Sequence, residues 1–217
     1  ITQFIDVVKF SLSGSPPLLA SGFSPLASLF SFSPQIAVGL PPKRNSYFKI
    51  SYMSLITVGT MAFDAIETPF GKTDKIVGGS AVYVAYAASN FVKPVQQISI
   101  IGDDFPEEEM ADLRSRGVHL DGVEIIQGKK SFFWSGRYHE DMNSRDTLVT
   151  ELNVLADFDP KIPDSYQGAE FLMLGNLAPK IQLNVIQELK QRPKLIAMDT
   201  MNFWMDIAMP ELKIVLK

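Results

Sequence analysis

The chain of 217 residues contains no cysteine, which excludes disulfide bonds, thiolate metal sites and a cysteine nucleophile. This absence fits a reducing compartment, and we expect a cytoplasmic location. Histidine is nearly as scarce, since His119 and His139 are the only two and lie at no metal-motif spacing. A zinc site is therefore not expected, and the sequence assigns no metal ligand.

The sequence also lacks a long hydrophobic run and an excess of positive charge. Proline or glycine interrupts the apolar stretches of residues 1–52, so none has the length that a membrane span requires. The net charge of -4 gives no reason to expect binding to nucleic acid or to an anionic membrane. The composition does supply 46% hydrophobic residues, enough for one domain with a substantial core.

Acidic residues are almost missing from residues 1–52, where Asp6 stands alone among many prolines and serines. The composition changes near Met53. We expect residues 1–52 to be a disordered or non-native N-terminal extension, with Met53 as the natural start of the protein. A transit or leader peptide is the alternative, although such a segment would be richer in arginine. No function is assigned to this segment.

A glycine pair, Gly78-Gly79, stands directly before the small and apolar run "SAVYVAYAASNF". Two adjacent glycines adopt backbone angles closed to other residues and let a ligand approach the main chain. The run is typical of a buried helix, whose first backbone N–H groups have no partner within the helix and can hold a polar or anionic ligand. The alternative interpretation is a tight turn that leads into a core helix.

From Met53 onward, apolar segments alternate with amphipathic ones. Residues 62–75 are expected to be polar turn material, and aromatic and β-branched residues between 123 and 160 predict a small β element that projects from the main sheet. The alternation itself indicates a parallel sheet covered by helices. Strands are predicted at 54–60, 96–104, 169–176 and 194–200, and helices after the glycine pair, at 106–117 and at 178–191.

Polar side chains follow the predicted strands, at the edge of the sheet where open α/β proteins bind their ligands. Each of these residues also has a simpler explanation, because Asp and Asn commonly cap helices and turns. Together they mark this edge as the candidate site. The residues are Asp64, Asp103, Asp104, Asn176, Asp199 and Asn202.

The order of "VGTMAFDAIET", "GGSAVYVAYAAS", "IGDDF" and "RSRGVHLDGV", followed by an aromatic β insertion, resembles the N-terminal two-thirds of the ribokinase-like (PfkB) carbohydrate kinases. The resemblance covers residues 53–217 and implies a partial kinase domain. Its α/β fold would be a parallel sheet sandwiched by helices, with a small β lid from about 65–77 and 123–160. Because the lid often makes the dimer contact in this family, a homodimer through the lid is also implied.

The resemblance implies a substrate-binding role for several residues. Asp64 corresponds to the carboxylate that holds sugar hydroxyls, and Gly78 and Gly79 correspond to the glycines whose backbone lies against the substrate. Tyr83 stands where many members have asparagine, so the pocket is altered there. Asn176 falls where a polar side chain reaches the substrate.

Two further assignments are looser. Arg137 is the charged lid candidate for contact with substrate or phosphate, and a solvated lid arginine is the alternative. "DTMNFW" departs from the Asp-x-Asn-x-Arg arrangement of the family and leaves Asp199 and Asn202 as phosphate-side candidates. Phe105-Pro106 replaces the glycine that usually follows Gly-Asp-Asp, which changes the local turn.

In this family, the Asn-x-x-Glu segment and the Gly-Ala-Gly-Asp motif with the general base would follow Lys217. The chain is therefore expected to be truncated, with its C-terminal part missing, without a catalytic residue and inactive alone. The implied parent activity is phosphorylation of a sugar or nucleoside hydroxyl with ATP and Mg²⁺. The competing hypothesis is a non-catalytic sugar- or nucleoside-binding module. A dehydrogenase is disfavoured, because "VGTMAFD" lacks the G-x-G-x-x-G loop.

Overall fold

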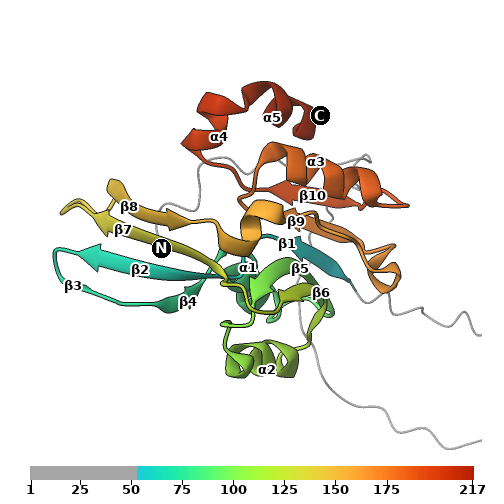
Figure 1. Ribbon diagram of the computed structural model, residues 1–217. Coiled ribbons are helices and arrows are strands. Elements are labelled where there is room, and N and C mark those ends of the chain that lie inside the picture. The colour runs from blue at the N-terminus through green and yellow to red at the C-terminus, as the bar shows by residue number, and fades with distance from the viewer. Residues whose placement is uncertain (1–52) are drawn as a thin grey trace, which may run out of the picture. The chain divides into compact units, whose positions relative to one another are not determined.

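A computed structural model of the chain describes residues 53–217, and the expectation for residues 1–52 lies outside this range. Its main element is a five-stranded sheet in the order β10-β9-β1-β5-β6 (Figure 1). All four pairings are parallel, as the alternation of strands and helices predicted. The strands are β1 (Leu55–Val58), β5 (Val95–Gly102), β6 (Val118–Ile126), β9 (Phe171–Leu174) and β10 (Leu195–Met198).

Burial explains why these segments form parallel strands. Every residue of β5 is buried, which is typical of a central strand covered on both faces. The structure differs from the sequence expectation at β6, because residues 123–126 belong to the main sheet and not to the projecting element. The polar alternation of β6 suits an edge strand and hid it from a search for apolar runs.

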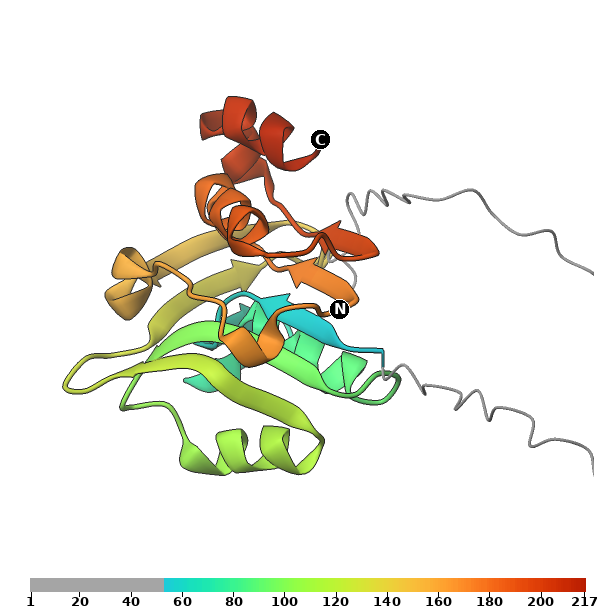
Figure 2. The ribbon, with the colours of Figure 1, turned by 90° about the vertical axis from the view of Figure 1, so that its right-hand side faces the viewer.

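Helices cover both faces of the main sheet, and Figure 2 shows α2 and α3 on opposite sides of it. Alternate residues of β5 point to opposite cores, so Val95 and Ile101 pack with α1 and α2, whereas Ile98 and Ile100 pack with α3 and α5. The helices are α1 (Ser80–Ala88), α2 (Glu107–Ser115), α3 (Pro179–Glu188), α4 (Asn202–Ile207) and α5 (Met209–Val215), with two 3₁₀ turns, η1 (Asn153–Asp157) and η2 (Asp164–Tyr166).

The helix predicted at 106–117 shows how the sequence sets its ends. Pro106 caps α2 and three glutamates occupy the first turn, where the helix dipole favours negative charge. Arg114 lies in the last turn, and Gly117 follows with a φ of 84°. The first and last turns thus carry the charges that stabilise a helix.

The projecting element is a second, mixed sheet in the order β3-β2-β7-β8, with β4 paired to β2. We call this sheet the lid. Its strands are β2 (Ala62–Thr68), β3 (Gly71–Lys72), β4 (Ile76–Gly78), β7 (Phe132–Tyr138) and β8 (Arg145–Glu151). The expectation of turn material over 62–75 is therefore wrong for β2 and β3, whose residues pair with neighbouring strands.

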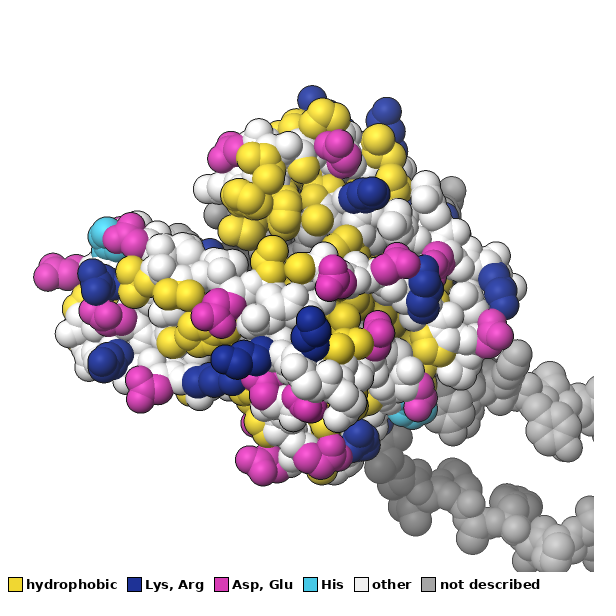
Figure 3. Space-filling model, viewed as in Figure 1, with side chains coloured by type: hydrophobic (Ala, Val, Ile, Leu, Met, Phe, Trp, Pro, Cys, Tyr) yellow, Lys and Arg dark blue, Asp and Glu magenta, His cyan; other side chains and the backbone are white. Residues whose placement is uncertain are grey.

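The C-terminal helices leave apolar side chains at the surface. Phe203 is 51% exposed and Ile207 is 62% exposed, and Figure 3 shows hydrophobic side chains gathered over α4 and α5. None of the helices between Met53 and Lys217 has the length and apolar character needed to cross a membrane.

Candidate substrate site

The glycine pair joins the lid to α1, and both glycines are required by close contacts. Gly79 caps α1 with a φ of 96°, and a Cβ at this residue would overlap the carbonyl oxygen of Thr60. A Cβ at Gly78 would overlap the Asp64 carboxylate, which lies directly against the glycine backbone. The pair therefore serves both the turn and the close approach of Asp64.

The start of α1 binds acceptors of the protein itself. The Ser80 N–H donates to Oγ1 of Thr60 at 3.1 Å, and the Ala81 N–H donates to the Thr60 carbonyl at 3.0 Å. The Gly79 N–H donates to the carboxylate of Asp64. The expectation of helix N–H groups open to an anionic ligand is therefore not met at these residues.

Asp64 is a partly buried carboxylate whose charge is weakly compensated. Burial raises its pKa to about 6, and the hydrogen bond from Gly79 acts in the opposite direction. The side chain is thus mostly ionised at pH 7 but becomes protonated in a mildly acidic solution. An ionised carboxylate accepts hydrogen bonds and suits a ligand with neighbouring hydroxyl groups.

Two aromatic side chains of the lid share a face with Asp64. Trp134 of β7 is the register partner of Asp64 in β2, and Tyr138 lies on the same face because strand side chains alternate. The Arg145 guanidinium lies 5.7 Å from the Trp134 ring centroid and 5.9 Å from that of Tyr138. These distances are within the range of cation–π attraction. We call Trp134, Tyr138 and Arg145 the aromatic lid surface.

Local contacts fix the Trp134 ring on this surface. The ring lies across Gly136, where a Cβ would overlap it. Its Nε1–H donates to Oγ1 of Thr147 at 3.3 Å. The aromatic lid surface is therefore held in place before any ligand binds.

Tyr83 connects α1 to this surface. Its side chain is 47% exposed. Burial raises the pKa of the Tyr83 hydroxyl, and the nearby negative charge of Asp64 adds to this rise. The structure therefore brings together four of the predicted residues, namely Asp64, Gly78, Gly79 and Tyr83.

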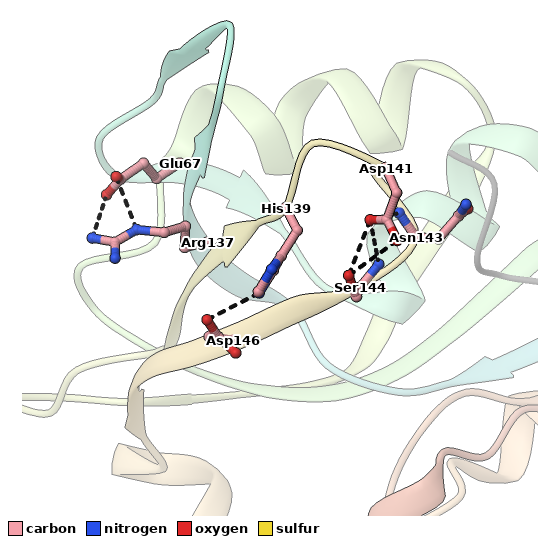
Figure 4. Close-up of polar contacts among 7 residues, drawn as sticks. All are labelled: Glu67, Arg137, His139, Asp141, Asn143, Ser144 and Asp146. Carbon is pink, nitrogen blue, oxygen red and sulfur yellow. Dashed lines mark hydrogen bonds and ion pairs between the residues drawn. The ribbon is translucent and has the colours of Figure 1, made fainter.

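Arg137 lies on the other face of the lid. It is three residues beyond Trp134, and the period of two along a strand turns it away from Asp64. Its Nε and Nη2 donate to the Glu67 carboxylate at 2.9 and 3.3 Å (Figure 4). The predicted contact of Arg137 with substrate is thus not supported by this geometry, and Arg145 is the arginine on the Asp64 face.

Asn176, which follows β9, is bound by the segment that starts α4. Its Oδ1 accepts a hydrogen bond from Nε1 of Trp204 at 2.9 Å, and its Nδ2 donates to Sδ of Met201 at 3.1 Å. Asn202 begins α4 between these two partners. The side chain predicted to reach the substrate is therefore oriented by α4.

Asp199 lies opposite Gly175, the residue before Asn176, because β9 and β10 are adjacent and end in register. Burial raises the pKa of Asp199, and a hydrogen bond from the Thr200 N–H opposes this rise. Gln182 joins the two strand ends by donating to the carbonyls of Gly175 and Asp199, at 2.9 Å each. Within residues 53–217, no three Asp, Glu or His side chains lie close enough to hold a metal ion.

Sequence reasoning missed Trp134, Tyr138, Arg145 and Trp204. The segment "FFWSGRY" does place Trp134 and Tyr138 on one side of a strand by their even spacing. Nothing in that spacing says which side faces Asp64. This depends on the register between β2 and β7, which are far apart in the sequence.

Comparisons with known proteins bear on the fold and on the family resemblance. No family model matches the chain. The cytidine kinase of Thermococcus kodakarensis is 31% identical over 139 residues, which make up 64% of this chain and 49% of that protein. The chain thus spans about half the length of the curated relative that it matches.

Solved structures show the same fold. The nucleoside kinase of Burkholderia thailandensis, in complex with inosine, has a TM-score of 0.52 at 14% identity, over 62% of this chain and 49% of that one. A Methanocaldococcus jannaschii nucleoside kinase, an archaeal member of the ribokinase family, has a TM-score of 0.50 at 14% identity, over 65% and 50%. The ribokinase-like α/β fold is confirmed, as is the resemblance to ribokinase-like (PfkB) kinases.

We predict that Gly79→Ala lowers the free energy of unfolding by about 2 kcal/mol, because it combines a strained backbone with an overlap at Thr60. Urea denaturation would measure the loss. Gly128→Ala is the matched control, since Gly128 also has a positive φ but open space where its Cβ would lie. Equal losses in the two variants would contradict the role of the Thr60 contact.

We predict that Asp64 makes the protein less stable as the pH rises from about 4 to 6. The unfolded chain ionises this side chain near its ordinary pKa, whereas the folded protein keeps it protonated until about pH 6. Asp64→Asn should therefore be more stable than the wild type at pH 7, by about 3 kcal/mol, and equal to it below pH 4. Urea midpoints of both proteins across this range are the test, and parallel curves would refute it.

We predict an energetic coupling of about 1 kcal/mol between Asn176 and Trp204, the size of a net hydrogen bond. A double-mutant cycle with Asn176→Ala and Trp204→Phe measures it, since phenylalanine has an aromatic ring but lacks the N–H donor of the indole. Additive losses of stability would show that the bond does not hold Asn176 in solution.

Proposed function

We propose that residues 53–217 form the acceptor-binding half of an ATP-dependent nucleoside kinase, which phosphorylates a hydroxyl of the ribose. The observation that carries the proposal is the position of the Asp64 carboxylate, against Gly78 and on the same face as the aromatic lid surface. A nucleoside needs both features. Its sugar has hydroxyls for a carboxylate, and its flat base suits stacking on tryptophan or tyrosine.

The roles of the residues follow from their chemistry. Asp64 would accept hydrogen bonds from two sugar hydroxyls, and the bare backbone at Gly78 would let the ribose approach. Trp134 and Tyr138 would contact the base, with Arg145 behind their rings. Tyr83 would close the side toward α1. The cytidine kinase of Thermococcus kodakarensis and the inosine complex of the Burkholderia enzyme support a nucleoside over a simple sugar.

The phosphate donor is proposed to be ATP with Mg²⁺, which is consistent with the complex of the Burkholderia thailandensis nucleoside kinase with ADP-inosine. Mg²⁺ in such sites is held by one or two carboxylates together with phosphates and water. Asp199, which follows β10, supplies a carboxylate, and Asn202, which begins α4, supplies an amide. These side chains fit the phosphate side of the site, where the magnesium ion would neutralise charge on the transferred phosphoryl group.

The residues of the chain would bind and orient the acceptor, and none of residues 53–217 is proposed as the general base. We therefore expect the chain alone to bind nucleoside without phosphorylating it. Cytoplasmic location and a homodimer through the lid also stay proposals.

The binding test uses the full chain and its two tryptophans, Trp134 and Trp204, as fluorescent reporters. Cytidine and inosine should bind at least tenfold more tightly than ribose. Trp134→Ala should weaken nucleoside binding about tenfold or more, the loss of one stacked base, and leave ribose binding unchanged. Calorimetry is used for this variant, because it lacks one reporter.

Phe70→Ala is the control, since Phe70 is an exposed aromatic residue of the same lid. It should bind nucleosides like the wild type. Asp64→Asn should weaken nucleosides and ribose alike, by about tenfold or more, because a charged hydrogen-bond acceptor is lost. Equal affinity of the wild type for ribose and nucleosides would rule out the proposed role of the lid.

The second candidate is a non-catalytic nucleoside-binding module, favoured by the strand-end Asn176 being already occupied by Trp204. A chimera separates the two functions. Residues 53–217 would be joined to the unmatched half of the Thermococcus kodakarensis cytidine kinase. The kinase hypothesis predicts cytidine phosphorylation by the chimera and its loss in Asp64→Asn. A binding module predicts a chimera that folds and binds cytidine without turnover.

A further inference from the structure

Asp104 links the two arms that make up the lid, through Lys75 of arm 1 and through Ser131, the residue before arm 2. Arm 1 is β2 to β4 (residues 62–78) and arm 2 is β7 to β8 (residues 132–151). Asp104 belongs to neither arm, since it follows β5 of the main sheet. Its Oδ2 accepts from Nζ of Lys75, in the turn of arm 1, at 3.0 Å. Its Oδ1 accepts from the N–H and Oγ–H of Ser131, directly before arm 2, at 2.8 and 2.7 Å.

Ser131 fastens both ends of arm 2 to the end of β5. Its side chain is 1% exposed, and its Oγ accepts from the Gly102 N–H at 3.0 Å while donating to Asp104. The Ser131 carbonyl accepts from Nδ2 of Asn153, just after arm 2, at 2.9 Å. The residues on either side of arm 2 are therefore joined to each other and to Gly102, at the end of β5.

Lys75 ties the same carboxylate to the strand that carries Asp64. Its Nζ lies 3.7 Å from the ring centroid of Phe63, within the range of a cation–π contact. Phe63 is buried and packs on the Phe105 ring at 5.7 Å, next to Asp104 in sequence. Asp64 follows Phe63 directly, so a shift of Lys75 would also move the strand at the candidate site.

The lowered pKa of Asp104 indicates that its ion pair with Lys75 stays charged. Burial alone would raise the pKa of Asp104, but the hydrogen bonds from Ser131 and Lys75 outweigh it and leave the pKa lowered. The Lys75 side chain is 48% exposed, and ion pairs this exposed contribute little to global stability. The link is therefore better suited to fixing the orientation of the lid than to holding the protein folded.

We infer that Asp104 is a positioning residue for the candidate site, which fixes both lid arms against the main sheet through Lys75 and Ser131. The distance between Asp64 on arm 1 and Tyr83 on α1 is set by this link, as is the distance from the aromatic lid surface to the strand ends. Loss of the link gives the lid more orientations, and ligand affinity falls because fewer of them are competent to bind. The part that concerns affinity rests on the proposed nucleoside binding.

The first measurement is backbone hydrogen exchange of the full chain without ligand, which reports local opening of the lid. Lys75→Met should exchange at least about fivefold faster in arm 1, and Asp104→Asn should do so in both arms. Lys75→Arg, which keeps the charge, should resemble the wild type. Lys72→Met removes an exposed lysine from the same arm and is the matched control. Unchanged exchange in both Lys75→Met and Asp104→Asn would overturn the inference.

The second measurement is the dissociation constant for cytidine, read from tryptophan fluorescence. Lys75→Met should raise it about threefold to tenfold at an unchanged urea midpoint, and Lys75→Arg should restore it. The double variant that combines Lys75→Met with Asp104→Asn should bind cytidine no worse than Asp104→Asn alone. Faster exchange with unchanged affinity would refute positioning.

If wild type binds no nucleoside, the proposed function fails, while the exchange data still decide whether the link holds the lid. If Asp104→Asn does not fold, Lys75→Met decides.

Discussion

The contact between the Asp64 carboxylate and the bare backbone of Gly78 is the constraint on which the candidate site depends. It requires glycine at residue 78, and it places the carboxylate next to the turn that starts α1. The same contact removes Asp64 from water on one side, and burial raises its pKa to about 6. The protein accepts an unfavourable, weakly compensated charge at this residue. Such an arrangement is typical of functional sites, where stability is given up for a group that must meet a ligand.

The period of two along a strand then decides which side chains join Asp64. Trp134 and Tyr138 share its face because they are separated by an even number of residues in β7 and because β7 pairs with β2 in this register. Arg145 joins them as the register partner of Tyr138 in β8. Arg137 is an odd number of residues from Trp134, so its side chain lies on the opposite face of the lid. There it pairs with Glu67. A shift of one residue in the register would exchange the two arginines.

Local patterns in the sequence were enough to predict four strands of the parallel sheet, three of its helices and the turn that the glycine pair makes before α1. Apolar runs, helix-end charges and glycines are local signals, and they predicted β1, β5, β9, β10, α2 and α3. The lid strands β2 and β3 could not be predicted in this way. Their polar residues are stabilised by partners such as Arg137, which lies 70 residues from Glu67 along the chain. The binding of Asn176 by Trp204 is hidden for the same reason, since it depends on how α4 turns back over β9.

The acidic residues after the strands show that one sequence pattern can serve two physical roles. Asp64 has a raised pKa because burial dominates and no cation of the described residues offsets it. Asp104 has a lowered pKa because Ser131 and Lys75 use both of its oxygens. A carboxylate that is fully satisfied within the protein holds structure well and has little left for a ligand, whereas the reverse is true of Asp64. Asp64, inside β2, and Asp104, after β5, therefore differ in their partners, and under the proposed function only Asp64 has an acceptor left for a ligand.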